Sequence, residues 1–137
     1  MIILIDENLP PQLADGLNIL QHQLNVRNQT NHEVKSIKNE FGEGCKDEDW
    51  IPEAGKRNSV VITRDFRIQR IRHQRDLCVQ YGLGLFFFNV PKGGLPYWQI
   101  VVNLITRWED ILKIIDEEKP PFAYRFSVKS KKLELLD

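Results

Sequence analysis

Three aspartates stand where short apolar segments end or where an acidic helix begins, and their positions suggest chemistry carried out by carboxylates. Asp6 follows the apolar run Ile2–Ile5, Asp65 follows the apolar segment Ser59–Thr63, and Asp47 opens an acidic stretch between them. In an open α/β sheet, ligands bind beyond the carboxyl ends of the strands. If the two apolar segments are neighbouring parallel strands, all three side chains open at the same edge.

Three carboxylates brought together repel one another, and burial strengthens that repulsion. A divalent cation offsets the repulsion between the carboxylates, and oxygen ligands with room for water favour Mg²⁺ or Mn²⁺. Such an ion activates water and stabilises charge on a phosphate, which suits phosphodiester hydrolysis. The competing interpretation is structural: Asp6 and Asp65 form turns, and Asp47 is a helix N-cap. Position alone leaves both interpretations open.

The elements that must position these residues alternate between strands and helices. Strands are predicted at residues 2–5, 33–37, 59–63 and 85–90, the second being the weakest. After Asn8, a reasonable N-cap, a helix carries an apolar stripe from Leu9 to Leu20, with prolines in its first turn. A second helix runs from Asp47 to about Lys56 and requires Pro52 in its first turn, and a basic helix extends to Tyr81.

The strongest helical period covers residues 97–118, with one apolar face marked by Trp98, Val101, Ile105, Trp108, Leu112 and Ile115. This face is typical of core or of a dimer interface. Residues 120–137 form a C-terminal strand-like extension with pieces at 122–128 and 132–136, read as an added hairpin. The alternation predicts a single α/β domain over residues 1–137. A mostly parallel central sheet should carry helices on both faces and end in a C-terminal β-hairpin.

Composition sets further limits. The chain has 137 residues, enough for one domain with a genuine core, and 19 basic residues balance 19 acidic ones, so net charge alone indicates no nucleic-acid partner. Cys45 and Cys78 lack metal-binding spacing and are expected to be reduced. No apolar run approaches the roughly 20 residues of a membrane span. A soluble cytoplasmic protein without a signal peptide or membrane partner is therefore expected.

A local basic excess follows the proposed metal site. Seven Lys or Arg residues against one acidic residue lie between Lys56 and Arg75. Within that segment Arg64, Arg67 and Arg70 are the candidate contacts to an RNA backbone. A solvated helix face explains the same charges equally well, and no interleaved aromatic residues support base stacking.

The segments MIILIDENLPP, GCKDEDWIPEA and SVVITRD resemble the PIN-like toxin nucleases related to VapC, and PFAYRF resembles the closing strand of that family. The resemblance spans most of the chain and implies the three-layer PIN-like fold. It also implies Mg²⁺- or Mn²⁺-dependent RNA cleavage, with metal ligands falling on Asp6, Asp47 and Asp65. A cognate antitoxin that inhibits the enzyme and a homodimer belong to the same expectation.

One departure from the family pattern affects the metal site. A fourth acidic residue usually follows the "TRD" strand, whereas Gln74 occupies that position here, with Asp76 a poorly placed substitute. Glu7 or Asp49 are the alternatives that would complete the site. A PIN-like module that has weakened or lost catalysis and binds only RNA or a protein is therefore a competing hypothesis.

A second competing hypothesis is a two-component receiver domain, because ILIDEN is similar to the acidic pair that ends the first strand of those modules. Receivers need five alternating strand–helix units. The sequence after Asp65 offers one parallel strand before the long helix and the tail, and Lys92 follows that strand as Pro-Lys rather than Lys-Pro. This count argues against a receiver.

Overall fold

The computed structural model describes residues 1–64, 67–130 and 132–136. Within them the strands form one sheet in the order β2-β1-β3-β4-β5-β6. All neighbours pair in parallel except β5 and β6, which are antiparallel. The strands are β1 (Ile2–Ile5), β2 (Glu33–Ser36), β3 (Ser59–Thr63), β4 (Gly84–Asn89), β5 (Phe122–Ser127) and β6 (Glu134–Leu135). The helices are α1 (Pro11–Asn28), α2 (Ile37–Phe41), α3 (Asp47–Lys56), α4 (Ile68–Tyr81) and α5 (Tyr97–Glu117).

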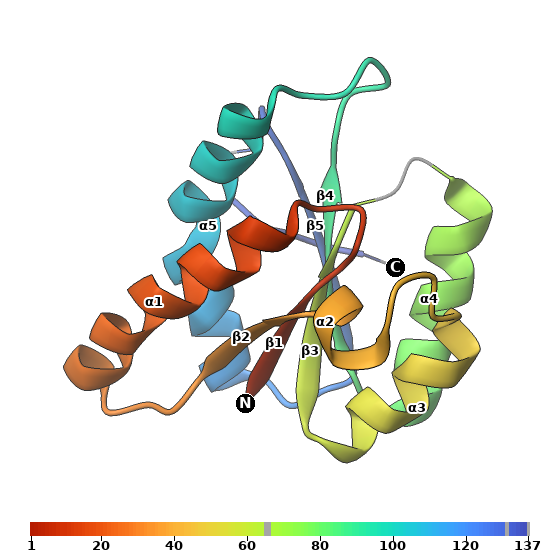
Figure 1. The fold of residues 1–137 in the computed structure, drawn as a ribbon, viewed down its shortest axis with the longest axis horizontal. Helices are drawn as coiled ribbons and strands as arrows, with labels where there is room; N and C mark the ends of the chain where they lie inside the picture. The colour runs from red at the N-terminus through yellow and green to blue at the C-terminus, as the bar shows by residue number, and fades with distance from the viewer. Residues whose placement is uncertain (65–66, 131, 137) are drawn as a thin grey trace.

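Helices cover both faces of the sheet, as the strand–helix alternation predicted. Figure 1 shows α1 and α5 on one side of the strands and α3 and α4 on the other. Side chains on consecutive strand positions point to opposite faces, so Ile3 and Ile5 of β1 pack under α1 and α5, while Leu4 packs with α3 and α4. Burial on both faces explains why the central strands β1, β3 and β4 are mostly apolar.

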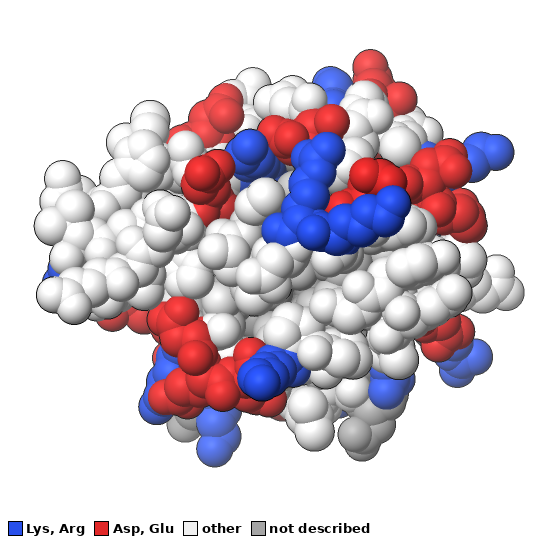
Figure 2. All heavy atoms as spheres, turned by 90° about the horizontal axis from the view of Figure 1, so that it is seen from below, with Lys and Arg blue, Asp and Glu red and all other residues white. Residues whose placement is uncertain are grey.

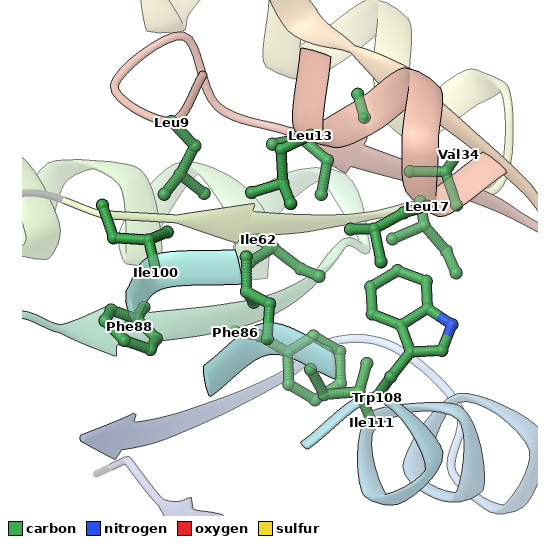
Figure 3. Close-up of a cluster of buried hydrophobic side chains, with 14 of the residues drawn as sticks. Leu9, Leu13, Leu17, Val34, Ile62, Phe86, Phe88, Ile100, Trp108 and Ile111 are labelled. Carbon is green, nitrogen blue, oxygen red and sulfur yellow. The ribbon is translucent and has the colours of Figure 1, made fainter. Parts of the chain in front are cut away.

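The core under α1 and α5 joins distant parts of the chain. Leu13 and Leu17 of α1 meet Phe86 of β4 and Trp108 of α5 in this cluster (Figure 3). The Trp108 indole N–H donates to Gln21 Oε1 at 2.7 Å, which satisfies two buried polar groups inside it.

The strand order creates the binding edge that the aspartates require. The chain leaves β1 toward β2 on one side, then crosses back to place β3 on the other side of β1. Ligands bind at such a reversal, beyond the carboxyl ends of the two central strands. Because Ile5 pairs with Ile62, Asp6 and Thr63 lie next to each other at this point. The adjacency of the first and third apolar segments, which a common edge requires, is therefore present.

Two details predicted for the first helix were wrong. The cap residue of α1 is Pro10, which offers no side-chain acceptor, and the Asn8 side chain turns instead toward Asp6. Leu13 and Leu17 are buried as predicted, but Leu20 is 54% exposed. Gln21 and Leu24, further along the same helix, are buried or packed against the core, so Leu20 lies to the side of the stripe that faces the sheet.

In α3, Pro52 is the sixth helical residue and lies beyond the first turn, contrary to the prediction. An interior proline has no N–H to donate to the carbonyl four residues before it, yet α3 continues through Pro52 to Lys56. The helix that carries Asp47 therefore has the predicted bounds, although its proline is not in the first turn.

In α5, Trp98 and Ile105 are exposed, contrary to the predicted single face. The helix has apolar residues on two adjoining stripes, and Leu104 and Ile111 of the second stripe are fully buried against the sheet. The tail also differs: β5 pairs in parallel with β4 and belongs to the main sheet, and only the two-residue β6 makes an antiparallel hairpin with it.

Close packing between β3, β4 and β5 leaves no room for a side chain at Gly84. A Cβ atom there would lie 2.4 Å from Phe122 Cζ and 2.9 Å from Val60 Cγ1. We expect Gly84→Ala to lower the free energy of unfolding by about 1–3 kcal/mol, measured by urea denaturation. Gly16→Ala is the matched control, since nothing lies within 4 Å of its Cβ position and alanine favours the helix. Equal stability of the two variants would contradict this packing.

Candidate active site

Asp6 is a buried carboxylate held from several sides. Its side chain is 1% exposed, and the Thr63 hydroxyl donates to Oδ2 at 2.6 Å while the backbone N–H of Glu7 donates to Oδ1 at 2.9 Å. Burial raises the pKa of Asp6 above its ordinary value, and the Thr63 hydrogen bond, the Arg70 charge and the Glu7 N–H only partly offset that effect. The nearby Asp47 charge raises it further. The folded chain thus keeps a carboxylate where ionisation is costly.

Asp47 reaches the same place from the first residue of α3. It is 8% exposed, and the Trp50 indole N–H, one turn further along the helix, donates to Oδ1 at 3.1 Å. Trp50 is itself 1% exposed, so its buried ring holds the Asp47 carboxylate in one orientation. The acidic first turn of α3 also lies at the positive end of the helix dipole. Together these contacts hold a second buried carboxylate.

One arginine joins the two carboxylates. Arg70, in the first turn of α4, places Nη2 3.7 Å from Asp6 Oδ1 and Nε 3.4 Å from Asp47 Oδ2. The guanidinium is largely buried, with 18% of its side chain exposed. Two aspartates 41 positions apart in sequence therefore share one cationic partner, which brings them together in a single cluster.

Gln74 completes this cluster from the next turn of α4. It is 1% exposed, its Nε2 lies 3.5 Å from Asp47 Oδ1, and its Oε1 lies 3.4 Å from the Thr63 hydroxyl. Residues four apart on a helix share a face, so Arg70 and Gln74 approach the acids together. Position 74, where the family pattern expects an acid, is thus inside the cluster. The Gln74 amide there joins Asp47 to Thr63.

The predicted site residues fall into distinct places. Asp6 and Asp47 meet at the strand-order reversal, while Asp65 lies outside the described residues. Glu7 is half-buried and accepts the Gly44 N–H at 3.1 Å. Asp49 is exposed on α3.

The two alternative acids nevertheless lie near the cluster. Burial, followed by the charges of Asp49, Glu7 and Asp47, raises the pKa of the Cys45 thiol. Three acids therefore surround this loop, where the chain enters α3. Cys45 and Cys78 are both free thiols, as predicted.

The arginines proposed as RNA contacts differ in their surroundings. Arg67 is exposed at the start of α4, Arg64 is half-buried with Nη1 3.5 Å from the Asn8 carbonyl, and Arg70 is paired with the two acids. Farther from the acids, Lys56 pairs with Glu53 at 3.2 Å and Arg57 with Glu40 at 3.3 Å. Much of the local basic excess is therefore compensated by acidic neighbours.

The donor set suits a hard divalent cation, although it is not a complete metal site by itself. No group of three or more His, Cys, Asp or Glu side chains is arranged to hold a metal ion within residues 1–64, 67–130 and 132–136. Asp6 and Asp47 supply two buried carboxylates, and Thr63 and Gln74 add oxygen atoms beside them. The raised pKa of Asp6 indicates that more positive charge beside it would stabilise its ionised carboxylate. These residues fit Mg²⁺ or Mn²⁺ chemistry.

Sequence reasoning missed Thr63, Trp50 and the bridging role of Arg70. Two of these had local signals: Trp50 is three residues after Asp47 on one helix, and Thr63 ends the strand beside Asp6. Arg70 was proposed for phosphate, because nothing in the spacing reveals which way its helix packs.

A family model described as a PIN like domain matches residues 1–90, which include both strands and both helices of this cluster. No curated protein and no solved structure matches the chain. Within the described part of the chain, every helix is too short or too polar to cross a membrane.

Proposed function

We propose that this chain, which belongs to the PIN-like domain family, is a divalent-metal-dependent ribonuclease that cleaves RNA endonucleolytically. The observation that carries the proposal is the convergence of buried Asp6 and Asp47 at the strand-order reversal of a nuclease-type fold. Arg70 only partly offsets the cost of burying the Asp6 carboxylate beside Asp47, so the pair is better explained by function than by stability.

In this proposal Asp6 and Asp47 hold the ion, and Asp65 is the third ligand. The ion supplies an activated water and neutralises charge developing on the scissile phosphate. Thr63 and the Glu7 N–H fix the orientation of the Asp6 carboxylate, and Trp50 fixes that of Asp47. Gln74 links the two acids without adding charge. Glu7 or Asp49 remain the candidates for a further carboxylate.

Arg64, Arg67 and Arg70 are the proposed contacts to the RNA backbone. Arg67 is exposed at the start of α4, where the helix dipole also favours a phosphate. Arg70 supplies the positive charge between the acids when no ion is bound, and we propose that it turns toward the phosphate when the ion replaces it.

The biological setting proposed for this activity is a toxin–antitoxin module of the VapC type. It rests on the sequence resemblance in the DENLP and TRD segments. Expression of the chain alone should then arrest growth, and co-expression of a protein encoded next to it should restore growth.

The direct test combines RNA cleavage with metal binding. Purified chain should cut single-stranded RNA in Mn²⁺ or Mg²⁺ and stop when EDTA is added. Calorimetric titration with Mn²⁺ should show binding by the native chain and at least tenfold weaker binding by Asp65→Asn. Absence of Mn²⁺ binding by the native chain would rule out the proposal.

A binding module that has lost catalysis is the second candidate, and the amide at Gln74 in place of an acid favours it. The binding module and the nuclease predict different results. A binding module would bind RNA in gel-shift experiments with equal affinity in Mn²⁺ and EDTA, and would leave the RNA intact.

A receiver domain also needs a test, because the strand count used against it was wrong. The parallel order β2-β1-β3-β4-β5 is the doubly wound order of receivers, and Lys129 follows β5. Lys129 lines a pocket with Asn89 and Ser127. The PIN-like match and the role of Asp47 favour the nuclease. Covalent labelling of one aspartate by acetyl phosphate would favour the receiver instead.

A further inference from the structure

Exposed apolar side chains line the junction of α1 and α5 in the described chain. They are Leu20 (54%), Tyr97 (47%), Trp98 (66%) and Ile105 (48%), and the same two helices also expose Ile19 (68%) and Val102 (41%). A contiguous patch of this kind on a small domain marks an interaction surface, and tryptophan is among the residues that contribute most to binding.

The surface is hollowed into a groove rather than flat. Two adjoining hollows of about 110 and 140 Å³ lie between the helices, and both are lined by Leu17, Leu20 and Ile105. Gly16 lines the first hollow and has nothing within 4 Å of its Cβ position, so a partner backbone can approach closely there. We call the two hollows together the α1–α5 groove.

The groove has a direction. Helices α1 and α5 each follow the carboxyl end of a strand and run back along the sheet, so they start at the same end of it and cross obliquely on the left of Figure 1. One end, with Trp98, lies toward the edge that carries Asp6. From Trp98 to Asp116 is 18 helical residues, or about 27 Å, which matches a docked helix of about five turns.

The far end of the groove is acidic. A third hollow of about 390 Å³ continues from Glu109, which also lines the second, and it is bordered by four acidic and two basic side chains. The acidic ones are Glu109, Asp110, Asp116 and Glu117, against Arg27 and Lys113. Figure 2 views the molecule from this end and shows a group of acidic side chains, with basic side chains among them, beside uncharged surface. The carboxyl ends of α1 and α5 add the negative ends of two helix dipoles.

Pairing within the chain leaves part of this negative charge for a partner. Arg27 is engaged with Glu109 at 3.0 Å, and Asp116 accepts from His32 at 2.9 Å. Asp110 and Glu117 remain exposed beside a single lysine, Lys113. An apolar channel that ends in such a pocket is complementary to a ligand that is apolar along one face and cationic at one end.

From this complementarity we propose that the α1–α5 groove binds one amphipathic helix of another protein, with Lys or Arg residues at the end that lies over Glu109–Glu117. Apolar residues at spacing i, i+4 and i+7 would fill the two hollows. A second copy of this chain fits less well: an antiparallel pair leaves both acidic ends against uncharged surface, and a parallel pair sets them against each other. Docking of a helix here is independent of whether the chain cleaves RNA.

The test uses the full chain and a phage-displayed library of 18-residue helical peptides with randomised side chains on one face and at both ends. We expect selection to enrich helices with one apolar face and a basic end. A synthetic peptide from this set should bind with a Kd in the micromolar range and shift the Trp98 fluorescence to shorter wavelength.

Substitutions then locate the site. Ile105→Lys should weaken binding at least tenfold, whereas Val79→Lys, at another exposed apolar position on α4, should leave it unchanged. The double variant Asp110→Lys, Glu117→Lys should select acidic-ended helices instead. Failure to enrich helices, enrichment without basic ends, binding indifferent to Ile105→Lys, or self-association of the chain that Ile105→Lys abolishes would each overturn the proposal.

Discussion

Replacing Asp6 by asparagine is expected to reduce metal-dependent RNA cleavage by more than about 100-fold, because partners that merely orient metal ligands already contribute about 10–100-fold. The substitution keeps the size of the side chain and one acceptor oxygen. The Thr63 hydroxyl can donate to Gln74 Oε1, 3.4 Å away, and accept from the new amide. Fragment analysis on single-stranded RNA in Mn²⁺ measures the loss.

The same substitution is expected to stabilise the metal-free fold by roughly 0.5–2 kcal/mol, the usual gain when a strained functional group is removed. Burial raises the pKa of Asp6, so the folded chain binds this proton more tightly than the unfolded chain. Stability is therefore lost as the pH rises from the ordinary pKa of 3.8 through the raised folded value. Urea denaturation in EDTA should show the gain of Asp6→Asn at pH 8 and its disappearance below about pH 4.

Asp76→Asn is the matched control, because it makes the same chemical change at an exposed position on α4. It should change neither cleavage nor the pH dependence of stability. If Asp6→Asn cut RNA as fast as the native chain, Asp6 would have no role in a metal centre. If it were less stable than the native chain at pH 8, the carboxylate would be structural.

Replacing Gln74 by glutamate is expected to destabilise the metal-free chain and to strengthen its binding of Mn²⁺. In EDTA the new carboxylate would face Asp47 Oδ1 across about the 3.5 Å that now separates it from the Gln74 amide. It would replace a donor by a like charge at a site 1% exposed, which should cost about 3–5 kcal/mol of unfolding free energy.

With Mn²⁺ the same carboxylate becomes an additional ligand, and the lost free energy of unfolding should be recovered. Titration calorimetry should show Mn²⁺ bound at least tenfold more tightly than by the native chain, and cleavage should rise at limiting metal. A saturating ion then stabilises the variant by several kcal/mol relative to EDTA.

Gln69→Glu controls for the added charge, since Gln69 is exposed on the same helix. It should leave both stability and Mn²⁺ affinity unchanged. Loss of stability in Gln74→Glu that saturating Mn²⁺ fails to restore would show that position 74 does not face the ion. The proposed reason for weakened catalysis would then be wrong.

The sequence by itself determined the strands, the layer arrangement and two of the acids that meet. Apolar runs such as Ile2–Ile5 and Ser59–Thr63 could be identified because a strand buried on both faces carries apolar residues at consecutive positions. Asp6 could be placed because an aspartate directly after such a strand opens at the carboxyl edge of a parallel sheet. These are local rules, and each needs only a few neighbouring residues.

Only the tertiary structure decided which residues compensate the negative charge of the acids and which apolar residues are exposed to solvent. Arg70 lies between Asp6 and Asp47, and Gln74 joins Asp47 to Thr63, because α4 packs against α3 with one particular face inward. Likewise, Trp98 follows the same period as buried Trp108, yet it is exposed because α5 turns the stripe with Leu104 toward the sheet. Spacing specifies which side chains share a face, whereas the rotation and reach of each helix follow from the packing of the whole chain.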